Sequence, residues 1–265
     1  MKILTFTFET TLRFSEPVSD HAFVLRCLPH STPTQTVLDS QLIVSPRTTV
    51  SAQRDGFGNE LRIGRINRPH DDFDFIASGL AVVDALPSGA PEYAHPMFLG
   101  DSPRATADAA IRAFADDVLR VMGNASPAEK ALRLAHALHE RMAYSPGATD
   151  VTTTAADAFA AGAGVCQDFT HVLIAACRAA GVSARYTSGL MLGEGATHAW
   201  AEVYDGEHWR GIDPTNDRAV DDGYIAFSHG RDFSDCPIET GVFRGGARQS
   251  QHVAVSVSCD GEAAR

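Results

Sequence analysis

The sequence predicts an α+β protein in which a strand-rich domain precedes a region that contains both helices and strands. Three observations support this prediction. Apolar and polar residues alternate over much of the first hundred positions, helical periodicity with capping residues occupies residues 105–180, and alternation returns from Val182 onward. Runs of strands followed by runs of helices are typical of this fold class.

The strand-rich region begins at the N-terminus. Leu4, Phe6 and Phe8 alternate with threonines, which is the period of a half-buried strand. Turn-favouring residues separate further strand-like runs at residues 37–44, 61–66 and 73–83. Because no helical period longer than two turns occurs here, we expect a β-sandwich or a small barrel.

Residues 86–103 are rich in proline and glycine and predict a linker between two domains. We therefore expect a β-rich N-terminal domain over residues 1–95 and a second domain over residues 96–265. The second domain should end in strands, because residues 252–258 alternate again.

Helical periodicity predicts four helices in the second domain, over residues 105–122, 127–142, 155–161 and 166–180. Ser126 with Glu129, and Thr154 with Asp157, have the spacing of capping boxes at the second and third helices. Gly181 should end the fourth helix.

Composition excludes several classes of protein. Hydrophobic residues make up 44% of the 265 residues and charged residues 21%, which is typical of a folded globular chain. A formal net charge of -11 argues against nucleic acid and anionic membrane surfaces as partners. No apolar run approaches the ~20 residues of a membrane helix, and the N-terminus is typical of a strand and not of a signal peptide, so we expect a cytoplasmic protein.

The five cysteines are scattered and form no CxxC pair, so neither a zinc ribbon nor a disulfide framework is indicated. Cys166 differs from the others because two glycines precede it closely and a helix follows it. Unpaired N–H groups and the positive end of the helix dipole favour a thiolate in the first turn of a helix. We interpret Cys27, Cys177, Cys236 and Cys259 as packing residues.

The segment from His198 to Tyr204 alternates as a strand, and the following Asp205-Gly206 is a strong hairpin signal. A two-residue loop there would place His198 directly opposite Asp213, with Cβ atoms roughly 4.5–5.5 Å apart. At that separation the carboxylate can accept a hydrogen bond from the imidazole. The prediction depends on the register, because a slip of one residue would put the side chains on opposite faces.

Cys166, His198 and Asp213 together indicate acyl transfer, in which a thiolate attacks a carbonyl, an imidazole moves the proton and a carboxylate orients the imidazole. The backbone N–H of Cys166 is the obvious oxyanion donor, and the sequence identifies no second one. Trp200 should lie in the core. His171 should be packed and not catalytic, because it lies roughly 140° around the helix from Cys166. No HExxH, GxSxG or phosphate-binding loop occurs, so we expect neither metal nor cofactor.

Three motifs resemble those of the bacterial transglutaminase-like superfamily: Gly-Val-Cys166-Gln-Asp-Phe-Thr-His171, Thr-His198-Ala-Trp-Ala-Glu-Val and Ile-Asp213-Pro-Thr-Asn216. The N-terminal residues resemble the β-rich domain that precedes the core in that superfamily, so the resemblance covers nearly the whole chain. It implies a papain-like core of helices packed on an antiparallel sheet, with Cys166, His198 and Asp213 as the catalytic residues. The position of the papain oxyanion glutamine holds Ala160.

The expected activity is thiol-dependent acyl transfer from amide bonds of peptides or proteins through a thioester. We favour hydrolysis, as in cysteine proteases and amidases, over transfer to an amine, as in transglutaminases, and the sequence does not separate the two. A catalytically silent binding module is the alternative of another class, and the intact Cys-His-Asp set argues against it. A redox role for Cys166 is disfavoured, since no second cysteine is near it in sequence.

Overall fold

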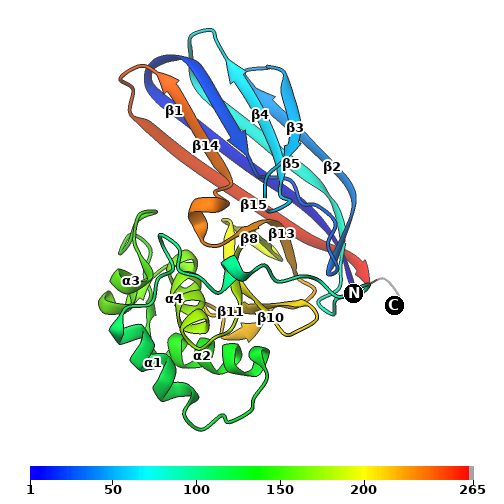
Figure 1. Cartoon of the computed structure of the whole chain (residues 1–265). Coiled ribbons are helices and arrows are strands. Elements are labelled where there is room, and N and C mark those ends of the chain that lie inside the picture. Colours follow the sequence, from blue (N-terminus) through cyan, green and yellow to red (C-terminus); the bar gives the residue numbers. More distant parts are fainter. Residues whose placement is uncertain (263–265) are drawn as a thin grey trace.

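A computed structural model describes residues 1–262 as two antiparallel sheets and a layer of helices (Figure 1). One sheet system has eight strands and contains both the first and the last strand of the described chain. The second sheet has five strands, and it lies between the first sheet and the helices. The predicted α+β fold class is therefore confirmed.

The long strand β1 (Lys2–Leu25) organises the N-terminal sandwich. Its first half pairs with β5 (His70–Val83) on one side and β15 (Gln249–Glu262) on the other. Its second half pairs with β4 (Glu60–Ile66) and β14 (Glu239–Arg244), so one strand contributes to both layers. The edges are β2 (Gln35–Ser45) beside β5 and β3 (Val50–Arg54) beside β4.

Phenylalanine side chains join this sandwich to the second sheet. Phe6 and Phe8 are buried, as their alternation predicts, and both contact Phe227 of the second sheet with ring centroids 5.7 and 5.9 Å apart. Leu190 and Ile225 of the second sheet belong to the same apolar cluster. Because the two sheets share one core, the position of the sandwich is tied to the strands behind the site.

The C-terminal strands differ from the expected organisation. The sequence assigns them to the domain over residues 96–265, but β14 and β15 pair with β1 in the first sheet. In sequence, the short strand β9 (Gly193–Gly195) falls between two strands of the second sheet. In space, it pairs with β15 and so belongs to the first sheet. The discrepancy arises because alternation predicts a strand but not its pairing partner.

The four predicted helices are α1 (Ala109–Leu119), α2 (Pro127–Arg141), α3 (Ala155–Ala161) and α4 (Cys166–Ala179). Both capping boxes are confirmed: the Ser126 and Thr154 hydroxyls accept from the N–H of the third helical residue, whose carboxylate accepts in return. The first helix is shorter than the predicted 105–122, because the Asp108 side chain accepts from the N–H of Ile111 and starts it later. Among the described helices, none is long and apolar enough to cross a membrane.

The second sheet carries the candidate site. Its strands, in spatial order, are β12 (Arg218–Ala219), β11 (Trp209–Asp213), β10 (His198–Tyr204), β8 (Ala184–Met191) and β13 (Tyr224–Gly230). Helix α4 packs against β10 and is buried from Asp168 to Arg178. Two-residue strands, β6 (Ala143–Tyr144) and β7 (Ala163–Gly164), pair in parallel just before α4. Short 3₁₀ helices cover Pro96–Phe98 and Phe233–Asp235.

Candidate active site

Cys166 is the first residue of α4 and is partly exposed. The first bonds of the helix run from the N–H groups of Asp168 and Phe169 to the carbonyl of Val165. Within residues 1–262, the N–H of Cys166 itself has no acceptor. A free N–H at a helix start can stabilise an anion. This N–H belongs to the same residue as the sulfur that would become a thiolate.

Asp168 holds the loop that leads into Cys166. Its Oδ2 accepts from the N–H of Val165 at 2.8 Å and from the hydroxyl of Thr149 at 2.6 Å. Burial raises the pKa of the Asp168 carboxyl, against these two hydrogen bonds, which lower it. A Cβ at position 164 would come within 2.6 Å of the Asp168 side chain, which explains the glycine there.

The candidate base is His198, at the start of β10. Its Nε2 lies 2.7 Å from Oδ2 of Asp213, which is completely buried. The bond at Nε2 leaves Nδ1 as the ring nitrogen for the thiol of Cys166, which is close enough to help raise the pKa of His198. The structure thus brings the three predicted residues together, with His198 bonded to Asp213 and influenced by Cys166.

Five donors surround the Asp213 carboxylate. Besides His198, Oδ2 accepts from Asn216 Nδ2 at 2.7 Å and from the hydroxyl of Tyr224 at 2.8 Å. Oδ1 accepts from the N–H groups of Thr215 and Asn216 at 3.0 and 3.2 Å. A buried charge is tolerated when such bonds replace its hydration, so Asp213 is held in its ionised form.

The pKa values of this pair follow from burial and hydrogen bonding. Burial lowers the pKa of His198, but the hydrogen bonds and charges of Asp213 and Cys166 outweigh it and raise the value to about 9. Burial would raise the pKa of Asp213, but the bonds from His198, Asn216 and Tyr224 hold it below its usual 3.8. An imidazolium next to a buried carboxylate can stabilise a neighbouring thiolate and supply a proton to a leaving group.

The predicted register of the hairpin that carries this pair is wrong. Ala201 faces Ile212 and Tyr204 faces Trp209, so the turn has four residues, 205–208, instead of two. This register is shifted by two residues from one that would set His198 directly opposite Asp213. A shift of two keeps side chains on the same face of the sheet.

The carboxylate of Asp205 explains the longer turn. It accepts from the N–H groups of Glu207 and His208 at 2.9 and 2.8 Å, and it also pairs with the Arg210 guanidinium at 2.6 Å. An aspartate that bonds the backbone two residues on favours such turns, and this competes with the tight Asp-Gly loop.

The other predictions for individual residues have mixed outcomes. His171 is fully buried, accepts from the N–H of Phe233 and has a pKa lowered by burial, so it is packed as predicted. Trp200 is buried as predicted. Cys27, Cys177 and Cys236 are buried as predicted, whereas Cys259 is exposed on β15, so its interpretation as a packing residue is wrong.

Sequence reasoning missed the roles of three residues. Asn216 stands inside the Ile-Asp-Pro-Thr-Asn motif, and its spacing from Asp213 could have suggested the contact. Tyr224 has no signal in the sequence, because its contact with Asp213 depends on how β13 returns to the sheet. Tyr144 pairs in register with Gly164 just before the nucleophile, and partial burial and the charge of Cys166 raise its pKa.

Within residues 1–262, no group of three or more histidine, cysteine or acidic side chains could hold a metal ion. The site offers side chains that can transfer protons and a sulfur that can form a covalent bond.

Comparison with known proteins places this geometry in a family. Residues 112–214 match the transglutaminase-like superfamily, and residues 4–82 match the bacterial transglutaminase-like N-terminal region. An uncharacterized protein of Mycobacterium tuberculosis (strain ATCC 25618 / H37Rv) is 29% identical over 96% of this chain and 90% of its own length. An uncharacterized protein of Mycobacterium leprae (strain TN) is 32% identical over 52% of this chain and 53% of its own length.

The fold also occurs in a solved structure. A Cytophaga hutchinsonii protein, described as a candidate cysteine protease, covers 100% of this chain and 93% of its own with a TM-score of 0.81 and 23% identity. That identity shows a shared fold. The family is shown by the two family matches, over residues 4–82 and 112–214, so the chain is a member of the transglutaminase-like superfamily with the bacterial transglutaminase-like N-terminal region.

Proposed function

We propose that this chain is a thiol-dependent enzyme that cleaves amide bonds of peptides or proteins, with Cys166 as nucleophile, His198 as acid and base, and Asp213 as the residue that orients His198. Hydrolysis is the favoured outcome. The observation that carries the proposal is the position of His198, which bonds a buried, ionised Asp213 through Nε2 and has its pKa raised both by that carboxylate and by Cys166.

The proposed reaction has two steps. The Cys166 thiolate attacks the amide carbonyl, the C–N bond breaks, and the His198 imidazolium protonates the departing amine, which leaves a thioester and neutral imidazole. Water then attacks the thioester while the imidazole accepts its proton, and the C–S bond breaks to release the acid and restore the thiolate–imidazolium pair. The free N–H of Cys166 would stabilise the oxyanion in both steps.

Alkylation of Cys166 tests the pair without knowledge of the substrate. Iodoacetamide at pH 6 should label Cys166 rapidly in the wild type, because a thiolate reacts and a thiol does not. His198→Ala should slow the labelling by at least about tenfold, by intact mass and peptide mapping. His136→Ala is the matched control, since His136 also bonds an aspartate, Asp217, at 2.7 Å but on the surface. Slow wild-type labelling, or equal rates in the His198 variant, would indicate a catalytically silent module.

Transfer to an amine is the second candidate reaction, and it shares the thioester. p-Nitrophenyl acetate should acetylate Cys166 with a burst of nitrophenol, and the fate of the acetyl group then separates the two reactions. Acetate as the main product in the presence of 10-fold molar excess amine over enzyme would support hydrolysis. Preferential formation of the acetamide at that low amine concentration would identify a transferase.

A further inference from the structure

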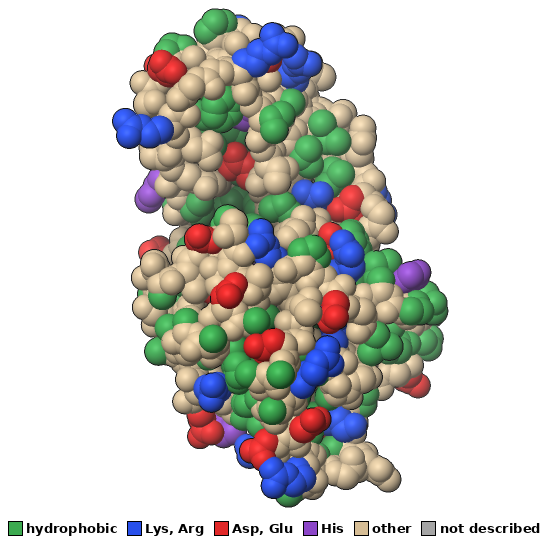
Figure 2. All heavy atoms as spheres, turned by 60° about the vertical axis from the view of Figure 1, so that its left-hand side comes forward, with side chains coloured by type: hydrophobic (Ala, Val, Ile, Leu, Met, Phe, Trp, Pro, Cys, Tyr) green, Lys and Arg blue, Asp and Glu red, His purple; other side chains and the backbone are tan. Residues whose placement is uncertain are grey.

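A cleft of about 550 Å³ opens between the sandwich and the second domain. The sandwich contributes Thr10 of β1 and Gln251 of β15, and the second domain contributes Arg104, Val151 and Thr197. Figure 2 shows the hollow where the upper, strand-rich part of the molecule meets the lower part, with hydrophobic side chains on its walls. The cleft is therefore accessible from solvent.

Two lining residues of the cleft are close in sequence to residues of the candidate active site. Thr197 precedes His198 in the chain, and Val151 is two residues from Thr149, whose hydroxyl bonds the Asp168 carboxylate behind Cys166. Because His198 would protonate the leaving amine, the part of a substrate that carries this amine would lie on the His198 side. A group on that side that passed Thr197 would enter the cleft.

Polar groups without partners line the cleft. Thr10 is 1% exposed, and its hydroxyl has no hydrogen-bond partner within residues 1–262. Nε of Arg104 is likewise buried and unpaired in that part of the chain. Buried polar atoms are nearly always hydrogen-bonded, so a ligand or water should complete this site. The Thr10 hydroxyl can accept from a cation, whereas the Arg104 N–H requires an acceptor such as water.

Glu239, at the start of β14, is the acidic residue of this cleft. Its carboxylate accepts one hydrogen bond, from Gln251 Nε2 at 3.1 Å, and forms no ion pair with any residue in 1–262. Burial raises its pKa to about 7, and no neighbouring cation offsets this. A half-buried carboxylate of this kind favours a positively charged ligand, which would replace its lost hydration.

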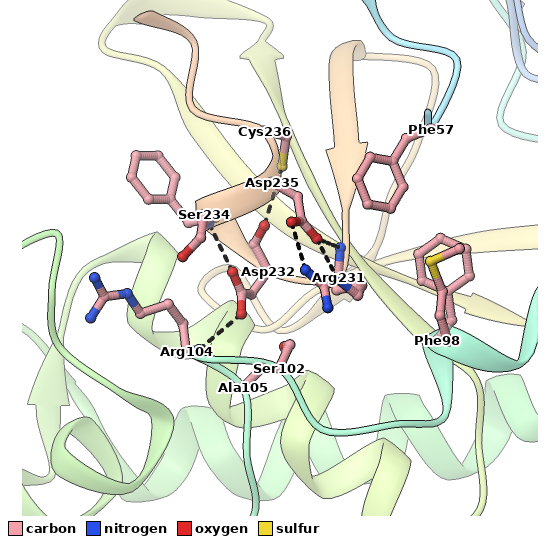
Figure 3. Close-up of polar contacts among 12 residues, drawn as sticks. Phe57, Phe98, Ser102, Arg104, Ala105, Arg231, Asp232, Ser234, Asp235 and Cys236 are labelled. Atoms are coloured by element: carbon pink, nitrogen blue, oxygen red, sulfur yellow. Dashed lines mark hydrogen bonds and ion pairs between the residues drawn. The ribbon is translucent and has the colours of Figure 1, made fainter. Parts of the chain in front are cut away.

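The cation of the cleft, Arg104, is turned elsewhere. Its Nη1 donates to the carbonyl of Thr152, and its backbone N–H donates to Asp232 Oδ2 at 2.8 Å. Figure 3 shows the guanidinium pointing away from Asp232, while Ser234, another cleft residue, bonds the other oxygen of that carboxylate through its N–H. Asp232 thus fixes the wall of the cleft, and Arg104 forms no ion pair with Glu239 in the described residues.

We propose that this cleft binds the amine-bearing portion of the substrate and that Glu239 selects portions carrying a second, non-reacting positive charge, such as a guanidinium or ammonium group. The proposal rests on the proposed function for the identity of the reacting amine. The positively charged group would lie against Glu239, and the chain between it and the reacting nitrogen would extend past Thr10 and Thr197.

Two matched amines test this selectivity. Agmatine and butylamine share a primary amine on a four-carbon chain, and only agmatine has a guanidinium at the far end. After acetylation of Cys166 by p-nitrophenyl acetate at pH 8, agmatine should remove the acetyl group about tenfold faster than butylamine at equal concentrations of free base, the ratio expected for one half-buried ion pair. Glu239→Gln, which keeps the shape of the side chain, should reduce the ratio to near one.

Glu9→Gln is the control, because Glu9 is exposed on β1 beside Thr10 and does not line this cleft. It should keep the tenfold ratio. A ratio near one in the wild type, or an undiminished ratio in Glu239→Gln, would overturn the proposal.

A binding measurement separates this proposal from the catalytic one. In a Cys166→Ala background, agmatine should bind with a dissociation constant at least about fivefold lower than that of butylamine in an NMR titration, and Glu239→Gln should remove the difference. If Cys166 fails to be acetylated or alkylated, the proposed function fails, but the titration still supports or overturns the cationic site.

Discussion

His198 and Asp213 lie diagonally across the β10–β11 hairpin, and their side chains nevertheless meet at 2.7 Å. In the observed register, extension of the pairing by one residue sets Asp213 opposite Trp200, whose ring stacks near the imidazole with centroids 6.4 Å apart. Diagonal neighbours on one face of a sheet are within reach of long side chains. The contact between acid and base therefore depends on side-chain reach as well as on strand pairing.

Replacement of Asp213 by asparagine should reverse the hydrogen bond to His198. The amide oxygen would keep the bonds from the N–H groups of Thr215 and Asn216, so the NH₂ group would face His198. Nε2 must then accept, and the ring proton moves to Nδ1, which faces the sulfur. We expect kcat to fall by about a thousandfold or more, as for the wrong tautomer in other triads. The measurement is the turnover of p-nitrophenyl acetate, with Asp217→Asn as the control because Asp217 bonds His136 at the surface. Similar activities for the two variants would contradict an orienting role for Asp213.

Replacement of Tyr224 by phenylalanine should remove one of the five donors to Asp213 and leave the ring in place. A hydrogen bond to a buried charged group contributes about 1.5–3 kcal/mol, so the free energy of unfolding should fall by about that amount in urea. Tyr93→Phe should have almost no effect, since Tyr93 is 76% exposed. An unchanged midpoint for Tyr224→Phe would show that the other four donors suffice.

The pH dependence of acylation should have an alkaline limb near pH 9. Above the His198 pKa of about 9 the imidazolium is lost, and with it the proton for the leaving amine. The same raised pKa stabilises the folded state fully below about 6.5, the unfolded value, and this contribution disappears as the pH rises through 9. Measurement of kcat/KM for an amide substrate from pH 6 to 10 checks the limb. A limb that begins near pH 7 would indicate that Asp213 and Cys166 do not raise the pKa of His198.

Alanine at position 164 should displace the carboxylate that holds the loop before Cys166, because its Cβ would lie 2.6 Å from the Asp168 side chain. Crowding of a packed site costs about 1–3 kcal/mol, so we expect a lower unfolding free energy and slower alkylation of Cys166. Gly56→Ala is the control, since nothing lies within 4 Å of a Cβ there. Normal alkylation in Gly164→Ala would show that Asp168 is not needed to place the nucleophile.

The sequence predicted those parts of the fold that local rules determine. The start of α4 at Cys166 and the two capping boxes depend on residues within four positions of one another, and all three are confirmed. The predicted register of the hairpin was wrong by two residues, because the Asp205 side chain competed with the Asp-Gly turn signal. Both turns involve Asp205 and differ by an even shift, so the alternation of the flanking strands does not distinguish them.

Contacts between distant parts of the chain could not be predicted from the sequence for a different reason. The contact of Tyr224 with Asp213, and the cleft that joins Thr10 to Thr197, require knowledge of which strands are neighbours. Periodicity predicts which face of a strand is buried but not which strands are its neighbours. For the same reason, the sequence assigned β14 and β15 to the second domain, whereas both pair with β1.

The pairing of β1 with β15 has a topological consequence. Lys2 lies beside Glu262, and the two ends of the described chain are close together in Figure 1. A circular permutant that joined residue 262 to residue 2 by a short linker, with new ends opened within residues 84–95, would traverse the helices and the second sheet first. It would then run through β14, β15 and β1 to β5 without interruption, so that the main strands of the sandwich, now split in sequence, would become contiguous.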